Sequence, residues 1–465
     1  MERWRPAAAR SGDEGIDLME RDDKVVQAEA AEEPAHVAGF GLPRPSPTLT
    51  ALTTSALALP GIVNPARADA PIERATSSAS FSYYFEDSLS PSDFDDQTGD
   101  RERYEVYTVQ ARTDVPVSDR VDVGVDFLWE KMSGASPWFV TARGGQVRQV
   151  MSGATIEDRR VDVTADVDFF MDTGKDTFSL GFSNEKDFLS IHGGIGAERN
   201  YNDKNTVLNV SGAFAYNWID PTDAELFPSI RPESEENWTI DLFGGVSQIL
   251  TRSSTVQFTI NYKHSDGYLS DPYKAITDVF QSAILSDERP DTKDQASFLL
   301  RYRHHIEPIN ASAHADYRLY VDDWGVVSHT VEAAWYQRFL EYFTFVPTLR
   351  WYSQSKADFY ETVLPADTAS NNPARERSSD FRLSPYGAFS VRGKIEAEFV
   401  DVLGYNPPAW LEAVGVTEGL DLIASLSYER YISGGDFSIV SVSERDEAPG
   451  LVNFHVIAIT LSGRF

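Results

Sequence analysis

The chain has 465 residues and no cysteine, and 41 Lys and Arg stand against 72 Asp and Glu, for a formal net charge of −31. The acidic balance excludes a nucleic-acid-binding protein, because binding to phosphates needs basic surfaces. The lack of cysteine excludes disulfides, cysteine–zinc sites, iron–sulfur clusters and thiol catalysis. Aromatic residues make up 12% of the chain, yet the mean hydropathy is slightly polar at −0.33. Apolar residues must therefore be finely interspersed with polar ones.

Two segments precede the main domain. Residues 1–47 are mixed in charge and rich in Pro and Ala, so we expect a disordered extension, or a true start codon further downstream. Residues 48–68 contain a short apolar run and end in Ala66-Arg67-Ala68, the small-residue pattern of a signal-peptide cleavage site. We therefore predict export, cleavage after Ala68, and one domain over residues 69–465.

Beyond the cleavage site, apolar and polar residues alternate in segments of about ten residues. The segment from Val121 to Glu130 places Val, Phe and Trp on one face and mainly Asp, Gly and Glu on the other, and the segment from Arg160 repeats this pattern. Successive side chains of a strand point to opposite faces, so the pattern predicts strands with one apolar and one polar face. No run of 18 apolar residues follows the cleavage site, which leaves a closed β-barrel as the way to span a membrane.

The links between these segments alternate in length, as tight periplasmic turns and longer extracellular loops do in outer-membrane barrels. A soluble β-sandwich has no reason to sort its loops in this way. We predict an all-β, transmembrane, antiparallel up-and-down barrel of about 18 strands, or of 16 if Phe437–Val442 is a loop. Short links are expected at 115–120, 171–176, 200–205, 251–254, 307–310, 340–341, 392–393 and 432–436. Long links are expected at 87–100, 131–155, 219–236, 269–291, 356–378 and 403–417.

The last segment is amphipathic and ends in a terminal phenylalanine. Such a strand resembles the assembly signal of bacterial outer-membrane proteins. We therefore predict localisation in the outer membrane, with membrane lipid and the barrel assembly machinery as partners. The residues expected to form this signal are Ile457, Ile459, Leu461 and Phe465.

The polar faces would line the lumen, where acidic residues outnumber basic ones and would favour cations. His314, Asp316 and Arg318 form a candidate polar cluster on this face, which could orient a catalytic base. A hydrogen-bonded network in the lumen wall is the simpler interpretation. The sequence contains no phosphate loop, dinucleotide fingerprint or c-type haem motif. We therefore predict no catalytic residue, no cofactor and no metal site.

Several longer segments are similar to one known family. They are GYLSDPYK at 267–274, DYRLYVDDWGVVSH at 316–329, LRWYSQSKADFY at 349–360 and SSDFRLSPYG at 378–387, together with the leader-like ALALPG at 56–61. From about Leu49 to Phe465 the chain resembles the bacterial domain-of-unknown-function 3570 family. The resemblance implies an exported protein of Gram-negative bacteria and an outer-membrane barrel, and it implies no activity or catalytic residue.

Three functions stay open, because a barrel alone does not define its function. The leading hypothesis is a non-enzymatic channel, or a sleeve around a partner protein. The second is a barrel enzyme that acts on lipid or peptide at the outer rim. The third is the barrel component of an extracytoplasmic electron-transfer complex, in which a periplasmic or redox partner would carry the haem.

Overall fold

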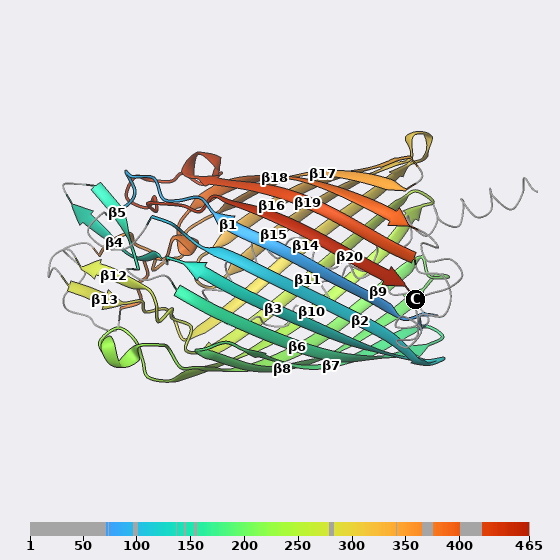
Figure 1. The fold of residues 1–465 in the computed structure, drawn as a ribbon, viewed down its shortest axis with the longest axis horizontal. Coiled ribbons are helices and arrows are strands. Elements are labelled where there is room, and N and C mark those ends of the chain that lie inside the picture. The colour runs from blue at the N-terminus through green and yellow to red at the C-terminus, as the bar shows by residue number, and fades with distance from the viewer. Residues whose placement is uncertain are drawn as a thin grey trace, which may run out of the picture.

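A computed structural model of the chain is a closed antiparallel β-barrel of 16 strands (Figure 1). The structure describes residues 71–72, 74–95, 101–135, 137–143, 146–152, 156–278, 283–340, 342–364, 375–399 and 421–464. The barrel strands, in order around the ring, are β1 (Thr76–Glu86), β2 (Glu105–Ser118), β3 (Val121–Gly134), β6 (Ile156–Met171), β7 (Gly174–Asn184), β8 (Phe188–Tyr201), β9 (Thr206–Ile219), β10 (Glu235–Thr251), β11 (Ser254–Gly267), β14 (Thr292–Ile306), β15 (Ala311–Asp322), β16 (Val327–Phe339), β17 (Phe343–Gln354), β18 (Tyr386–Phe399), β19 (Asp421–Gly434) and β20 (Phe454–Arg464). Strand β20 pairs with β1 along its whole length and closes the ring.

Smaller elements lie in the connections. One hairpin, β4 (Pro137–Arg143) with β5 (Gln146–Met151), belongs to the β3–β6 loop, and a second, β12 (Ala275–Asp278) with β13 (Ala283–Ser286), to the β11–β14 loop. The described residues also include four single-turn 3-10 helices, η1 (Ala224–Leu226), η2 (Glu307–Ile309), η3 (Phe381–Leu383) and η4 (Gly435–Phe437). Among the described residues, no helix is long and apolar enough to cross a membrane.

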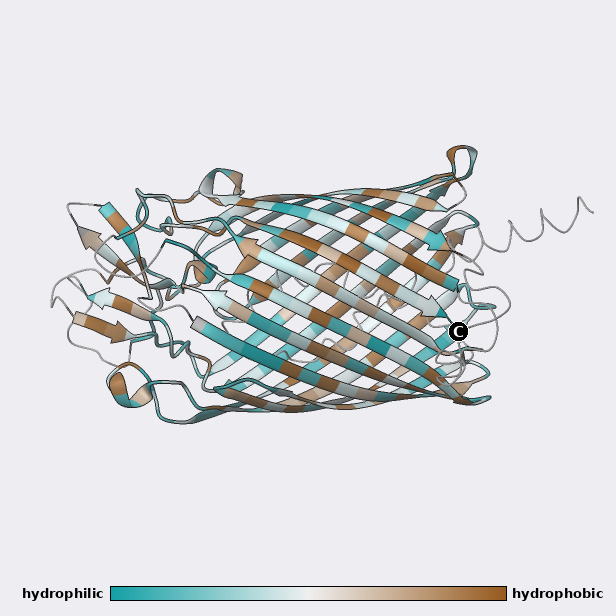
Figure 2. Ribbon diagram, viewed as in Figure 1, coloured by the Kyte–Doolittle hydropathy of each residue, from teal (hydrophilic) through white to brown (hydrophobic). Residues whose placement is uncertain are grey.

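The predicted alternation of faces is confirmed. On β3, the outward side chains of Val125 and Phe127 are 43% and 39% exposed, whereas the inward Asp122 and Glu130 are buried. Figure 2 shows the same alternation of apolar and polar residues along the other strands. The outward residues together form an apolar surface around the barrel, as a lipid-facing wall requires.

The two ends of the barrel differ in their connections. Turns of a few residues join β2 to β3, β6 to β7 and β10 to β11 at one end, where β1 also begins and β20 ends (Figure 1). The β3–β6 and β11–β14 loops, with their hairpins, lie at the other end. By the asymmetry usual in outer-membrane barrels, the short-turn end is periplasmic and the long-loop end extracellular.

The expected 18 strands are wrong and the alternative of 16 is confirmed. The predicted turn at Arg392–Gly393 does not exist, because β18 runs through it and Arg392 pairs with Thr348 on one side and Glu429 on the other. Gly favours turns locally, but pairing on both edges holds this segment in the sheet. Because this predicted turn is absent, the next links lie at the other end of the barrel from the one predicted.

The later links therefore change sides. The predicted short link at 432–436 contains the end of β19 and the start of an extracellular loop, and Phe437–Val442 belongs to that loop rather than to a strand. The predicted extracellular link at 403–417 lies outside the described residues, but the strand ends that it joins, Phe399 and Asp421, are at the periplasmic end.

Several predictions at the chain ends stay untested. The N-terminal extension, the signal peptide and Phe465 lie outside the described residues. Ile457, Ile459 and Leu461 lie on the outer face of β20, where they are 39%, 54% and 47% exposed. Their part in assembly stays a prediction.

A charge on the outer face tests the membrane placement. Val391→Arg, in the middle of β18, should lower the free energy of unfolding in lipid vesicles by about 2–4 kcal/mol, because it puts a guanidinium into hydrocarbon. Val117→Arg is the matched control, since Val117 is equally exposed but adjoins the periplasmic turn, where the cost falls to about 0–1 kcal/mol. Equal losses, measured by denaturant titration followed by tryptophan fluorescence, would contradict the placement.

Candidate functional site: the lumen and its extracellular mouth

One side of the lumen, formed by β2, β3 and β6, is acidic. The inward positions of these strands follow from their pairing, since directly paired residues share a face. They carry eight carboxylates, on Asp114, Asp122, Asp126, Glu130, Asp158, Asp162, Asp166 and Asp168, and two guanidinium groups, on Arg112 and Arg160.

Arg112 shows how this wall is packed. Its guanidinium pairs with Asp114 at 2.6 Å, with Asp166 at 3.0 Å and with Asp126. Gly124 of β3 leaves the room for this arrangement, because a Cβ atom there would lie 2.4 Å from Arg112 Nη2. One guanidinium faces three carboxylates, so this side keeps an excess of negative charge.

The opposite side of the lumen, formed by β14 to β17, is basic. In the ring of sixteen strands β3 is third and β15 is eleventh, half a turn apart, so the two sides face each other. The inward residues of β14 to β17 include six cations, on Lys293, Arg301, Arg303, Arg318, Arg338 and Arg350, and three carboxylates, on Asp316, Asp322 and Glu332.

On this side the cations outnumber the carboxylates with which they can pair. Asp316 receives two guanidinium groups, from Arg301 at 3.2 Å and from Arg303. Arg350 pairs with Glu332 at 2.6 Å. The two walls therefore carry opposite excess charge across the lumen. The acidity that the sequence predicted for the whole lumen is concentrated on one side.

The predicted cluster of His314, Asp316 and Arg318 lies on the inner face of β15, within the basic wall. Asp316 is engaged by the two arginines of β14, and among the described residues no hydrogen bond joins it to His314. His314 Nε2 lies 3.1 Å from Ser312 Oγ, and its ring contacts that of Tyr336 at 4.2 Å between centroids. His314 and Asp316 thus bond to other residues of the basic wall and not to each other, so they are not arranged as an oriented catalytic base.

Several lumen residues were not predicted from the sequence. Arg112, Asp114, Arg350 and Arg392 all face inward with the polar set of their strands. Extending the same alternation over β2, β17 and β18 would have found them. The extracellular loops offered no such signal.

The loop between β17 and β18 turns into the extracellular mouth of the lumen. Its Phe381 packs on an apolar cluster of inward-facing side chains at the outer strand ends, which includes Tyr84, Met132 and Phe454. Gln354, inward at the end of β17, donates from Nε2 to the carbonyl oxygens of Arg382 at 2.9 Å and Ser384 at 2.6 Å. These contacts hold η3 inside the rim.

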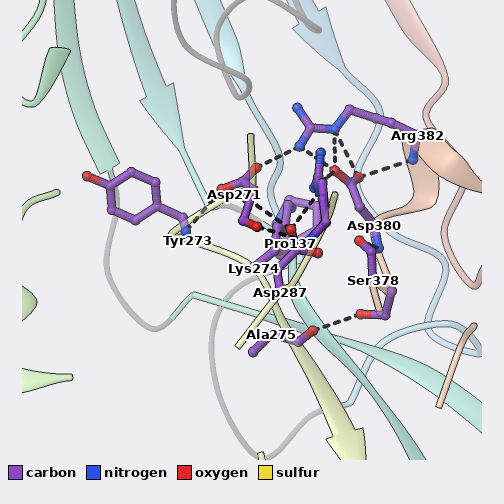
Figure 3. A network of polar contacts seen from close by, with 12 residues as sticks. Pro137, Asp271, Tyr273, Lys274, Ala275, Asp287, Ser378, Asp380 and Arg382 are labelled. Atoms are coloured by element: carbon purple, nitrogen blue, oxygen red, sulfur yellow. Dashed lines mark hydrogen bonds and ion pairs between the residues drawn. The ribbon is translucent and has the colours of Figure 1, made fainter. Parts of the chain in front are cut away.

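Beside η3, loops from separate parts of the ring meet in a buried ionic network (Figure 3). Arg382 pairs with Asp380 of its own loop and, at 2.7 Å, with Asp271 of the β11–β14 loop. Arg289 pairs with Asp287 at 2.6 Å and with Asp380 at 3.0 Å. Asp380 is thus shared by two guanidinium groups from two loops.

The same β11–β14 loop also reaches the loop that follows β3. Lys274 Nζ donates to the carbonyl oxygen of Pro137 (Figure 3), and Thr277 Oγ1 donates to that of Val140 at 2.6 Å. Strands β3 and β11 are six places apart in the ring, so these bonds bridge the mouth. We call the interlocked β3–β6, β11–β14 and β17–β18 loops the mouth cover.

Burial and neighbouring charges shift the pKa values in the mouth cover. Burial would raise the pKa of Asp380, but the positive charges of Arg382, Lys274 and Arg289 outweigh it and hold that pKa well below its usual range. Burial lowers the pKa of the Lys274 ammonium to about 8, although Asp380 opposes the shift. The cover therefore contains a carboxylate that stays ionised far into acid.

Removing this carboxylate should loosen the mouth cover. Asp380→Asn leaves three buried cations short of a counter-charge, which should lower the free energy of opening the cover by about 3–5 kcal/mol. Limited proteolysis of the folded barrel measures this as faster cleavage in the three loops. Asp223→Asn, in an exposed extracellular turn, is the matched control and should cleave at the wild-type rate. Equal rates for both variants would contradict the role of the network.

The same carboxylate makes the cover sensitive to acid. Because the folded pKa of Asp380 lies below its unfolded value of about 4, its contribution is complete above that pH and is lost as the pH falls toward the folded pKa. The difference in loop cleavage between wild type and Asp380→Asn should therefore be constant from about pH 7 to 5 and shrink below about pH 4. A difference that disappears already near neutral pH would be inconsistent with this assignment.

Solved structures with a similar barrel are distant. They include a FadL homologue of Pseudomonas aeruginosa (10% identity, 85% of this chain and 90% of that chain, TM-score 0.37). Others are a bacterial polysaccharide outer membrane secretin (8% identity, 84% and 98%, TM-score 0.40) and OccK5 (OpdH) of Pseudomonas aeruginosa (8% identity, 84% and 98%, TM-score 0.33). Likenesses this distant carry no argument about the function of this chain.

No curated protein matches the chain. The profile of the family described as "Protein of unknown function (DUF3570)" matches residues 49–406. This range contains the segments whose resemblance the sequence indicated, and it covers most of the chain. The protein is therefore an outer-membrane β-barrel that belongs to the DUF3570 family.

Proposed function

We propose that this protein is a non-enzymatic outer-membrane channel for small solutes that carry charge, with a mouth cover that opens and closes. The observation that carries the proposal is the lumen wall, in which the acidic side of β2, β3 and β6 faces the basic side of β14 to β17. Charged side chains on two facing walls suit a lumen that conducts polar solutes.

Opposite charges on facing walls set up an electric field across the lumen. A zwitterionic or strongly dipolar solute gains free energy by orienting in this field. An apolar solute gains nothing and must displace the water around the charged side chains. The larger excess lies on the acidic side, with eight carboxylates against two cations, which favours cations among simple ions.

Two observations favour this role over the alternatives. The interlocked loops at the mouth occupy space that a protein threaded through the barrel would need, which disfavours a sleeve or an electron-transfer conduit. The residue that best fitted a catalytic base, His314, bonds to Ser312 and is not oriented by Asp316, which supports a non-enzymatic barrel.

Conductance in planar bilayers tests the proposal. The purified protein should conduct weakly and prefer cations, and Asp380→Asn should conduct more often because its cover is loosened. Asp122→Asn with Asp168→Asn, which pair across β3 and β6 in the acidic wall, should shift the reversal potential in a salt gradient toward anions. Arg318→Gln, in the opposite wall, should shift it toward cations.

Asp172→Asn is the control, because Asp172 is exposed in a periplasmic turn outside the lumen. It should leave both conductance and selectivity unchanged. Absence of conductance in both the wild type and Asp380→Asn would contradict a channel. A selectivity shift with Asp172→Asn as large as that of the lumen variants would contradict the role of the walls.

A further inference from the structure

Three carboxylates converge at the extracellular ends of β6, β7 and β8. Asp158 faces inward near the start of β6, and Glu185 and Asp187 belong to the tight turn between β7 and β8. One carboxylate oxygen of each lies within 4.8 Å of the other two. The backbone N–H of Glu185 donates to the carbonyl oxygen of Phe188 at 2.7 Å and fixes the turn that carries two of the three.

Glu185 carries the most deeply buried carboxylate of the three. Its side chain is 1% exposed, and in the described part of the chain neither carboxylate oxygen accepts a hydrogen bond. Arg160 Nε lies 3.8 Å from Glu185 Oε1, beyond hydrogen-bond distance, and donates instead to Ser183 Oγ at 3.0 Å. The same guanidinium also faces Glu130 at 3.5 Å and Asp162 at 3.4 Å. Both buried oxygen atoms of Glu185 therefore lack a hydrogen bond, which is rare and costly, and one of them lies in the cluster.

Arg160, the guanidinium that faces Glu185, also faces Glu130 and Asp162, so it cannot balance all the carboxylates around it. A cation between the three carboxylates would offset their mutual repulsion and coordinate the buried oxygen atoms of Glu185.

We propose that Asp158, Glu185 and Asp187 bind one Ca²⁺ ion. The donor set contains only oxygen, which suits a hard cation and disfavours zinc or copper. Ca²⁺ takes about six to eight oxygen ligands in flexible geometry, and three carboxylates with some water can supply them. Mg²⁺ demands a near-octahedral shell and gives up its water reluctantly, so it suits this irregular, buried group less well.

The position of the site gives the ion a structural consequence. Tyr273 Oη donates to Asp187 and accepts a hydrogen bond from Thr222 N–H at 3.0 Å. The Tyr273 N–H in turn donates to Asp271, a member of the ionic network of the mouth cover, at 3.0 Å. A bound ion would thus fasten the ends of three strands to the cover. The site does not depend on the proposed channel function.

Calorimetric titration of the full, metal-stripped protein in detergent with CaCl₂ tests the site. Extracellular modules bind Ca²⁺ with a Kd of about 10⁻⁴–10⁻³ M, and we expect one saturable site of that affinity or tighter. Glu185→Gln keeps the shape of the side chain but removes its charge, and should weaken binding at least about tenfold, since ligand charge sets the affinity. The double variant Asp172→Asn and Asp203→Asn, at exposed periplasmic turns, removes two acidic groups elsewhere and should bind as the wild type does.

Thermal unfolding distinguishes a lost site from a misfolded variant. With a chelator present, Glu185→Gln should unfold no earlier than the wild type, because it lacks the buried charge. Added CaCl₂ should raise the unfolding temperature of the wild type and of the double variant but not of Glu185→Gln. Asp187→Asn changes a second proposed ligand in the same turn and should behave as Glu185→Gln does.

Several outcomes would overturn the proposal. No saturable binding by the wild type would mean that the three carboxyl groups hold protons rather than a metal ion. Undiminished binding by both Glu185→Gln and Asp187→Asn would place the ion elsewhere. Equal affinity for MgCl₂ in the same titration would refute the assignment to Ca²⁺. Conductance plays no part in these measurements, so they can fail while the channel proposal stands.

Discussion

A polypeptide inside hydrocarbon has to satisfy its own backbone hydrogen bonds, and the rest of this structure depends on that requirement. A sheet meets it only if its last strand pairs with its first, since an open edge leaves a row of N–H and C=O groups without partners. Here β20 pairs with β1 from Thr76↔Arg464 to Glu86↔Phe454. Closure also gives every strand an inside and an outside, and so turns a period of two in the sequence into a lipid face and a lumen.

Closure brings together charges that lie far apart in the chain. Since β3 and β15 are half a ring apart, the acidic and basic walls face each other although some 180 residues separate them. The loops follow the same geometry, and Arg382 meets Asp271 across 111 positions. An ion pair buried in this way often stabilises no more than apolar contacts of equal size would, but its members are readily hydrated once separated. A cover built from such pairs suits a mouth that opens into water.

The error in the predicted number of strands began at one segment of β18. Arg392–Gly393 has the composition of a turn, yet Thr348 and Glu429 pair with Arg392 from both sides and keep the segment in β18. The error inserted a turn into β18 and displaced the later links, and together with the false strand at Phe437–Val442 it made 18 strands out of 16. Here pairing with neighbouring strands outweighs the local propensity to form a turn. The sequence of one segment does not show which strands will be its neighbours.

The sequence by itself determined the class of fold, the lipid and lumen faces, and the inward positions of His314, Asp316 and Arg318, because alternation is a local property of the chain. Only the tertiary structure decided that Asp316 pairs with two arginines of β14, that opposite charges lie on two facing walls of the lumen, and that Asp158 lies beside Glu185 and Asp187. These contacts depend on which strands are neighbours in the ring and on how the loops fold back over its mouth. No local pattern of residues encodes either of them.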